Sequence, residues 1–515
     1  MKTYLKKNST TIIILSIILL LLFLAARGMS TKDFVITSLR GFSTGSVTFL
    51  VAAGFSLIFG LLDVLNLAQG TLYMIGAYVG WTVYVRTDTF IDLITPLLLI
   101  LAGFTLKPVW THLANRVKLK PKLTKVLVLA LIIVGIAGMV LIFTRYPIAF
   151  WDLDNYALSP ITYSFMAQQG APLPPVEVLF EDISPFLALV GLVLSSSIVA
   201  FGLALNQRRE NVYIKISWKQ FILFSVLILL GIVTIVFNTP VTNFLLSVSS
   251  NWLFLISVVV ATFSGVGLGG LLESTLIRPL YNRPIYQLML TIGIGTIGIE
   301  VVQSIWGRPE FVFPKPAFFR GTGEACPATS LSGIFTNNCS TVLLLDGRVR
   351  VYDEIFIPII GVLVLVAVWL LLKKTRIGMI IRAGVQDRQM VEALGINVRR
   401  VFTLVFSLGV GLAAFGGVLS APSIGLSTAM GERLLLSALI ALAVGGLTSY
   451  PGAALGSLLV GLIQQFLIKY GQIGIPIPFT DILFKPSPPI IPASTVLLMV
   501  IILLILPGGL LGKKE

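Results

Sequence analysis

The stretch from residue 355 to residue 372 reads IFIPIIGVLVLVAVWLLL and contains no charged residue. A helix of about 20 mostly apolar residues crosses the hydrocarbon core of a bilayer, so this run is close to that length. Asp353 and Glu354 precede the run, and Lys373 and Lys374 follow it. Such a segment is typical of a transmembrane helix, because lipid offers no hydrogen-bond partner to an open backbone.

The composition of the whole chain agrees with this interpretation. Of the 515 residues, 56% are hydrophobic and 11% are charged, whereas a soluble domain has about 25% charged residues. This excludes a large soluble enzyme, and the high hydrophobicity also excludes disorder. A net charge of +15 would suggest a nucleic acid partner in a soluble protein. Here it raises the question of which side of a membrane the basic residues face.

Similar apolar runs recur along the chain. We predict an all-α polytopic membrane protein with about 14 transmembrane helices, within a range of about 11–14. The first run follows three lysines and fits either a signal peptide or an uncleaved anchor. The pair of runs around the segment from Gly445 to Gly452 also fits one broken or re-entrant helix. The candidates are 11–26, 41–62, 66–85, 91–110, 125–144, 185–206, 220–237, 252–271, 285–305, 355–372, 401–420, 432–447, 453–470 and 494–511.

The distribution of charge predicts the orientation. With fourteen spans and a cytoplasmic N-terminus, about two thirds of the 37 Lys and Arg residues fall in cytoplasmic segments, which is the positive-inside pattern. Both termini are then cytoplasmic, and the protein lies in the cytoplasmic (inner) membrane. The loop 145–184, which contains five acidic residues, and the loop 306–354 lie outside, whereas the basic loop 373–400 lies inside.

The outer loop 306–354 contains the chain's two cysteines, Cys326 and Cys339. On an oxidising face they can form a disulfide, which would stabilise the loop by about 3 kcal/mol by chain entropy. Two free thiols in the loop are the alternative. A metal site would need more ligands than this pair supplies, so no metal centre is predicted.

The cytoplasmic loop 373–400 contains signals for a short helix. Asp387 can cap its start, because a carboxylate accepts hydrogen bonds from the first-turn N–H groups. Gly395 can end it in the left-handed conformation, and Asn397 can cap the helix that follows. Its apolar face would consist of Met390, Val391 and Leu394. Such a helix either docks into a groove of a partner or rests on lipid headgroups, and both readings remain open from the residues alone.

Catalytic chemistry is sparse in this sequence. His112 is the only histidine, and no G-x-x-x-x-G-K-[ST] motif occurs, so the chain has no recognisable nucleophile system or ATP site. We therefore predict that it is not an enzyme. Glu300 is the one acid clearly inside a predicted span, about five residues from its outer end, which leaves an ion-coupled carrier as an alternative.

Four groups of residues occur in one order over 41–85 and 252–470. They are Gly41-Phe42-Ser43-Thr44-Gly45-Ser46 with Asn66-Leu67-Ala68-Gln69-Gly70, Ile277-Arg278-Pro279-Leu280 with Leu290-Thr291-Ile292-Gly293, the segment from Arg382 to Asn397, and Gly445-Gly446-Leu447-Thr448-Ser449-Tyr450-Pro451-Gly452. Together they resemble the permease subunits of branched-chain amino acid ABC transporters. Urea and short-amide permeases are related to this family and supply the alternative substrate.

This resemblance implies an ABC importer permease fold and a set of partners. These are a second permease subunit, two cytoplasmic ATPase subunits that hydrolyse ATP, and an extracytoplasmic solute-binding protein. It also implies that the loop 373–400 docks on the ATPase, with Arg382, Ala383, Asp387, Glu392, Ala393, Gly395 and Ile396 as coupling residues. The implied structural or pathway residues are Gly45, Asn66, Gln69, Gly70, Gly445, Gly446 and Gly452.

The sequence departs from the family pattern in places. Gln69 stands where a histidine is usual, and Thr448 where a glycine is common. The stretch 86–251 resembles an insertion. The expected domains are an N-terminal anchor and connector (1–40), a first conserved helix pair (41–85), inserted helices (86–251) and a permease core (252–511).

Overall fold

The computed structural model describes residues 23, 27–62, 65–116, 120–146, 166, 169, 184–206, 218–281, 283–323, 326–386, 388–476 and 483–512. These residues are almost entirely helical, and ten of their helices are long and apolar enough to cross a membrane. The predicted all-α polytopic class is therefore confirmed. The ten are Thr31–Gly60, Thr87–Thr105, Lys122–Arg145, Leu187–Asn206, Trp218–Val236, Ser250–Leu280, Pro284–Trp306, Val351–Lys374, Val398–Ile424 and Tyr450–Ile473.

The count of fourteen and the position of the termini stay predictions. The first candidate, 11–26, lies outside the described residues. Three other candidates are helical but short, because α4 has 17 residues and α19 and α21 have 16 each. At about 1.5 Å per residue, such helices reach only about 24–26 Å, less than the hydrocarbon core of about 30 Å.

The chain divides into two compact units. Unit 1 comprises Met1–Trp81, Ser250–Ser304 and Arg308–Glu515, and unit 2 comprises Thr82–Ser249 and Ile305–Gly307. The domain boundaries expected from the sequence stay predictions.

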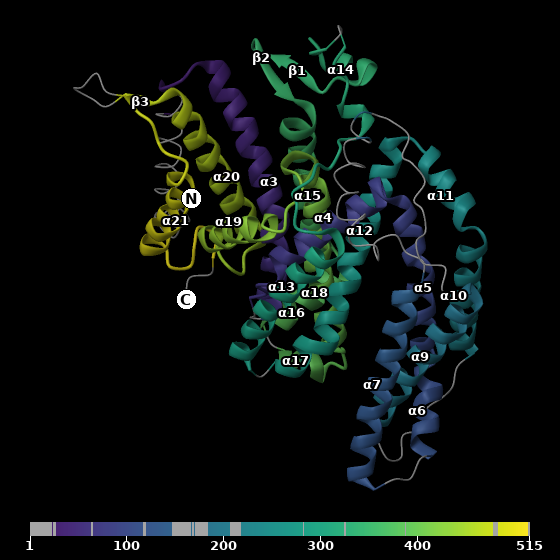
Figure 1. The fold of residues 1–515 in the computed structure, drawn as a ribbon. Helices are drawn as coiled ribbons and strands as arrows, with labels where there is room; N and C mark the ends of the chain where they lie inside the picture. The colour runs from purple at the N-terminus through teal and green to yellow at the C-terminus, as the bar shows by residue number, and fades with distance from the viewer. Residues whose placement is uncertain are drawn as a thin grey trace. The chain divides into compact units, whose positions relative to one another are not determined.

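Unit 1 is built around α3, which packs against α15, α18, α19 and α20. Figure 1 shows α3, α15 and α20 side by side. Small residues allow close approach, since a Cβ on Gly45 would lie 3.0 Å from the Leu458 Cα. The elements with their bounds are α3 (Thr31–Leu62), α4 (Gln69–Val85, ending in unit 2), α12 (Ser250–Leu272), η2 (Glu273–Ile277), η3 (Arg278–Leu280), α13 (Pro284–Trp306, ending in unit 2), η4 (Ala317–Phe319), α14 (Leu331–Asn337), β1 (Thr341–Leu344), β2 (Gly347–Arg350), η5 (Val351–Phe356), α15 (Ile357–Lys374), α16 (Arg376–Gln386), α17 (Arg388–Ala393), α18 (Val398–Ile424), α19 (Met430–Gly445), α20 (Tyr450–Ile473), β3 (Ile475–Pro476), β4 (Leu483–Phe484) and α21 (Ile490–Ile505).

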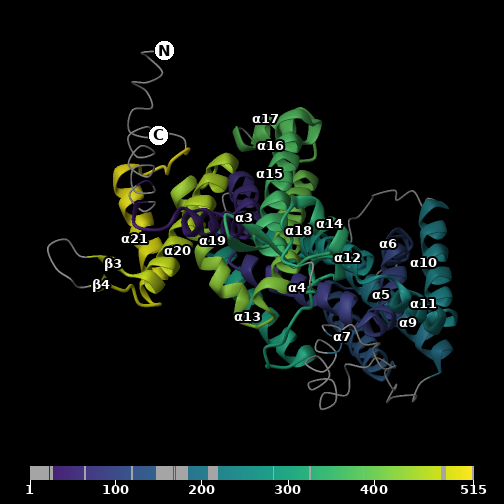
Figure 2. The same cartoon turned by 90° about the horizontal axis from the view of Figure 1, so that it is seen from above.

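A sharp break separates α19 from α20. Gly446 has a φ of 113°, which a residue with a side chain rarely adopts. The Ser449 side chain then caps α20 by accepting a hydrogen bond from the Gly452 N–H at 3.2 Å. A Cβ on Gly445 would collide with the Gly452 carbonyl, so the two helix ends meet backbone to backbone. Figure 2 shows α20 and α21 with the β3–β4 hairpin beside them.

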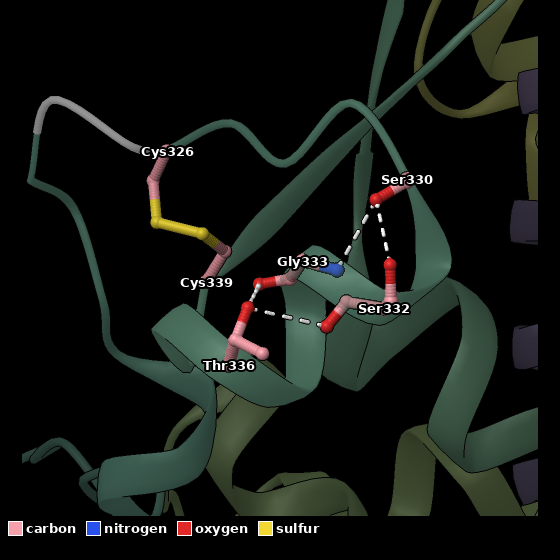
Figure 3. Close-up of a disulfide and its surroundings, with 6 residues drawn as sticks. All are labelled: Cys326, Ser330, Ser332, Gly333, Thr336 and Cys339. Carbon is pink, nitrogen blue, oxygen red and sulfur yellow. Dashed lines mark hydrogen bonds between the residues drawn. A yellow bond between two sulfur atoms is a disulfide. The ribbon is translucent and has the colours of Figure 1, made fainter.

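The loop before α15 forms a small substructure. Cys326 and Cys339 are joined by a disulfide, with their Cα atoms 5.5 Å apart (Figure 3). Beside it, the Ser330 side chain caps α14 by accepting from the Gly333 N–H at 3.2 Å. The strands β1 and β2 pair antiparallel and lead directly into η5. In Figure 1 this substructure and the helices α16 and α17 lie at opposite ends of α15.

Unit 2 is a smaller helical bundle. α5 packs against α9 and α10, and α7 packs against α9. The Thr95 hydroxyl donates to the Thr234 hydroxyl at 2.8 Å, which ties α5 to α10 inside an apolar setting. The helices that lie wholly in this unit are α5 (Thr87–Thr105), α6 (Lys107–Arg116), α7 (Pro121–Arg145), α9 (Pro185–Asn206), α10 (Trp218–Val236) and α11 (Asn238–Ser247).

Candidate functional site

The turn between α3 and α4 is held by a buried amide chain. The Asn66 side chain donates to the Gln69 side chain at 3.0 Å, and Gln69 donates to the Gly409 carbonyl of α18 at 2.8 Å. Asn66 and Gln69 are at most 1% exposed. A buried amide without partners would cost about 1–3 kcal/mol. These two hydrogen bonds therefore fix the non-helical turn against α18.

The beginning of α19 is buried beside the beginning of α4. A Cβ on Gly70 would lie 2.5 Å from the Gly431 carbonyl oxygen, and a Cβ on Gly431 would meet the Gly70 carbonyl in turn. Both residues are buried. The short helix α19 therefore begins inside unit 1, next to residues of the α3–α4 turn.

Unit 1 contains a cavity of about 380 Å³, which we call the polar cavity. It is lined by residues from α3, α4, α18, α19, α20 and the η5 region. Deep in it, the hydroxyls of Tyr73 and Ser420 are hydrogen-bonded to each other. The lining residues are Arg40, Ser43, Thr44, Val47, Tyr73, Arg350, Asp353, Glu354, Ile357, Ser420, Ser423, Ile424, Ser427, Met430, Arg433, Leu434 and Gln465.

One wall of the polar cavity is an ion-pair network. Glu354 is 1% exposed and accepts from the Arg40 Nε at 2.7 Å and from the Arg350 N–H at 3.0 Å. Asp353 pairs with Lys315 at 3.0 Å and with Arg350 at 3.2 Å. Because these charges come from Arg40 of α3, from Lys315 and from the segment 350–354, the network joins three separate parts of the chain.

The loop between α15 and α18 folds as two short helices. Gly395 ends α17 with a φ of 78°, and the Asn397 side chain caps α18 by accepting from the Arg400 N–H at 3.2 Å. The predictions for these two residues are confirmed. Asp387, the expected cap of α17, lies outside the described residues.

The predicted apolar face of α17 is wrong. Val391 is 3% exposed and packs into an apolar cluster with Leu57 and Phe402, whereas Met390 is 64% and Leu394 is 74% exposed. At about 100° per residue, adjacent positions such as 390 and 391 point in different directions, so one of them anchors the helix and the other faces out.

The other predicted coupling residues are likewise divided between packed and exposed positions. Ala383 and Ile396 pack against the apolar cluster. Glu392, Ala393 and Gly395 are exposed. Arg382 is also exposed and donates to the Leu372 carbonyl at the end of α15. An anchored helix therefore presents a short exposed edge at 392–395.

The structure brings some predicted pathway residues together and separates others. Asn66, Gln69 and Gly70 lie at one turn, beside α18 and α19. Gly445, Gly446 and Gly452 form the separate α19–α20 break, and Gly45 packs on α20. Glu300 is exposed on α13 and does not line the polar cavity. Among the described residues, no group of acids, cysteines and histidine has the arrangement of a metal site.

The cavity's charged residues are the part that sequence reasoning missed. Asp353 and Glu354 directly precede an apolar run, and the sequence predicts only that they lie in an outside loop. The available signal is an acidic pair at the mouth of a predicted span, with one arginine, Arg350, three positions before the first acid and four before the second. No comparable sequence pattern predicts that Arg433 lines the polar cavity.

The fold and site together define a class of protein. Long apolar helices contribute to an open cavity with polar and charged walls, and an anchored pair of short helices lies at the end of α15 away from the disulfide loop. A polar cavity inside a helical membrane protein is typical of a transport pathway. The chain is therefore a polytopic membrane transport protein.

The comparison with protein families gives the particular group. The family described as "Branched-chain amino acid transport system / permease component" matches residues 37–214 and 185–506. The chain belongs to this family. It is an ABC permease and a multi-pass protein of the inner membrane.

Curated relatives agree with this membership. The chain is 24% identical over 313 residues to the high-affinity branched-chain amino acid transport system permease protein LivH of Escherichia coli (strain K12), covering 60% of this chain and 86% of that protein. It is 28% identical over 218 residues to the corresponding protein BraD of Pseudomonas aeruginosa, covering 42% and 65%. The galactose/methyl galactoside import permease protein MglC of Haemophilus influenzae is 29% identical over 167 residues, covering 32% and 49%. No solved structure matches the chain.

Proposed function

We propose that the chain is the membrane-spanning subunit of an ATP-driven importer for branched-chain amino acids. The observation that carries this is the family match over most of the chain, together with relatives whose names specify that substrate class. A relative named for galactose matches a smaller share of this chain, and urea or short amides remain the alternative substrates from the sequence.

The partners in this proposal are a second permease subunit, two cytoplasmic ATPase subunits and an extracytoplasmic solute-binding protein. ATP hydrolysis belongs to the ATPase subunits. The assignment of ATP hydrolysis to separate subunits is supported by the sequence, which contains no phosphate-binding G-x-x-x-x-G-K-[ST] motif.

The ATPase docks on the edge formed by α17 and the turn after it. Val391 fixes α17 to the apolar cluster, while Met390 and Leu394 expose apolar surface that fits a partner's groove. Because Val398 and Phe402 of α18 belong to the same cluster, a movement of α17 is passed to α18. Alternating access then follows from closure of the ATPases, which shifts the helices around the polar cavity.

The coupling assignment is tested by Glu392→Lys and Gly395→Asp. The first reverses an exposed charge, and the second places a side chain at a φ of 78°. Both should weaken binding of the ATPase about fivefold or more, since truncation at a good interface position costs over about 1 kcal/mol, while membrane insertion persists. The matched control is Phe335→Lys, at an exposed site of the disulfide loop. ATPase recovery that stays at the wild-type level in both variants would refute the coupling role.

The substrate is tested by uptake into proteoliposomes that contain the full assembly and ATP. Labelled leucine should accumulate, and isoleucine and valine should compete, whereas urea and galactose should not. Uptake that proceeds without the ATPase and is lost in Glu300→Gln would instead establish an ion-coupled carrier.

A further inference from the structure

The charges that line the polar cavity are not balanced within it. The lining contains three cations, Arg40, Arg350 and Arg433, and two acids, Asp353 and Glu354. Arg40 and Arg350 both pair with the acids. Arg433, which is exposed, has no ion pair among the described residues. The cavity therefore has one cation whose charge the described wall does not satisfy.

The two acids are already occupied by the wall. Asp353 accepts hydrogen bonds from Lys315 and from the Ser423 hydroxyl, and it also forms an ion pair with Arg350. Glu354 lies between Arg40 and Arg350. Removing a partner from a buried ion pair is costly, so these acids hold α3, the 306–354 loop and α18 together and are not free cation receptors.

Arg433 lies in the first turn of a helix that begins inside the protein. The start of α19 packs against Gly70, and Met430, the first residue of α19, is 4% exposed. The N–H groups of Gly431 and Glu432 have no acceptor among the described residues. Such a helix end carries a partial positive charge, and short helices inside transporters point this end at anionic groups.

The remaining lining fits an aliphatic zwitterion. Val47, Ile424 and Leu434 supply apolar surface. The Gln465 amide nitrogen donates to Thr44 at 3.0 Å, which leaves its carbonyl oxygen and the Ser427 hydroxyl as acceptors for an ammonium group. The cavity volume of about 380 Å³ is within the range of small-ligand sites, about 300–1,000 Å³.

We propose that the polar cavity is a binding site for an aliphatic amino acid, whose carboxylate is held by Arg433 and the start of α19. This inference rests on the proposed import function and adds the recognition chemistry. A guanidinium binds a carboxylate through two parallel hydrogen bonds. Urea and short amides lack that group, so they leave Arg433 without a counter-charge and bind weakly.

The binding test uses the full chain in lipid nanodiscs and saturation-transfer NMR on the methyl signals of L-leucine and L-leucinamide. At pH 6 both amines are protonated, so the two probes differ only in that a neutral amide replaces the carboxylate. We expect transfer to leucine, with leucinamide at least about tenfold weaker, because a neutral amide cannot form the charge-assisted pair of hydrogen bonds that a carboxylate forms with a guanidinium. Equal transfer to both probes, or none to leucine, would overturn the proposal without any substitution being needed.

Variants then assign the discrimination to Arg433. Arg433→Gln should lose the preference for leucine over leucinamide, and Arg433→Lys should keep part of it, since the charge remains but the two-pronged geometry does not. The matched control is Arg348→Gln, an exposed arginine of β2 outside the lining, which should behave as wild type. An unchanged preference in Arg433→Gln would show that another group reads the carboxylate.

Uptake by the full assembly separates the two proposals. If ATP-dependent leucine uptake proceeds and Arg433→Gln still discriminates between the probes, the cavity assignment fails and the importer stands. If the purified chain discriminates but the assembly accumulates no amino acid, the importer proposal fails and the binding site stands.

Discussion

A fully buried charge in the described part of unit 1 shows what single residues contribute. Glu273 is fully buried and pairs with Arg278. The Arg278 Nη2 atom is 2.8 Å from the Glu273 Oε2 atom. The Tyr281 hydroxyl also donates to Glu273. Replacing Arg278 by Met leaves this buried carboxylate without its counter-charge, so we expect a loss of about 3–5 kcal/mol in unfolding free energy. Thermal unfolding in detergent measures the change.

The matched control at this scale is Lys469→Met. Lys469 pairs with Asp33 at 2.7 Å, but the two side chains are 21% and 32% exposed. A partly hydrated pair of this kind contributes about 0–1 kcal/mol. Equal shifts in melting temperature for the two variants would mean that burial does not set the strength of these pairs.

At the scale of elements, the α19–α20 break depends on two glycines in contact. A Cβ on Gly445 would collide with the Gly452 carbonyl, whereas a Cβ on Gly293 of α13 meets nothing within 4 Å. We therefore expect Gly445→Ala to destabilise the protein by about 1–3 kcal/mol through overpacking. Gly293→Ala should be neutral or stabilising by up to about 1 kcal/mol, because alanine favours the helix. A melting temperature that falls as much for Gly293→Ala as for Gly445→Ala would contradict this account.

The elements also show how far the sequence could lead. Apolar runs such as 355–372 predict α15 because length and composition are local properties. The end of α17 is also predicted by a local feature, the glycine at position 395. The orientation of Val391 was not, because it depends on Leu57 and Phe402 of other helices. The polar cavity needs Arg40, Glu354 and Arg433 at one place, and hydropathy carries no information about such long-range contacts.

For the whole molecule, the positive-inside pattern predicts the orientation in the membrane. Unit 1 offers two well-separated reporters, Phe335 in the disulfide loop and Leu394 after α17, which are 70% and 74% exposed. They lie towards opposite ends of α15, whose ends carry the disulfide substructure and α16–α17 (Figure 1).

Labelling with a membrane-impermeant maleimide tests this orientation in spheroplasts. Phe335→Cys should react at once, whereas Leu394→Cys should react only after the membrane is permeabilised, because the basic loop 373–400 is predicted to be cytoplasmic. The wild-type chain is the control, since both of its cysteines are in the disulfide, and it should stay unlabelled until a reductant is added. The reverse order of labelling would show that the protein has the opposite orientation in the membrane. It would then separate the α17 edge from any cytoplasmic ATPase, so the orientation and the coupling proposal stand or fall together.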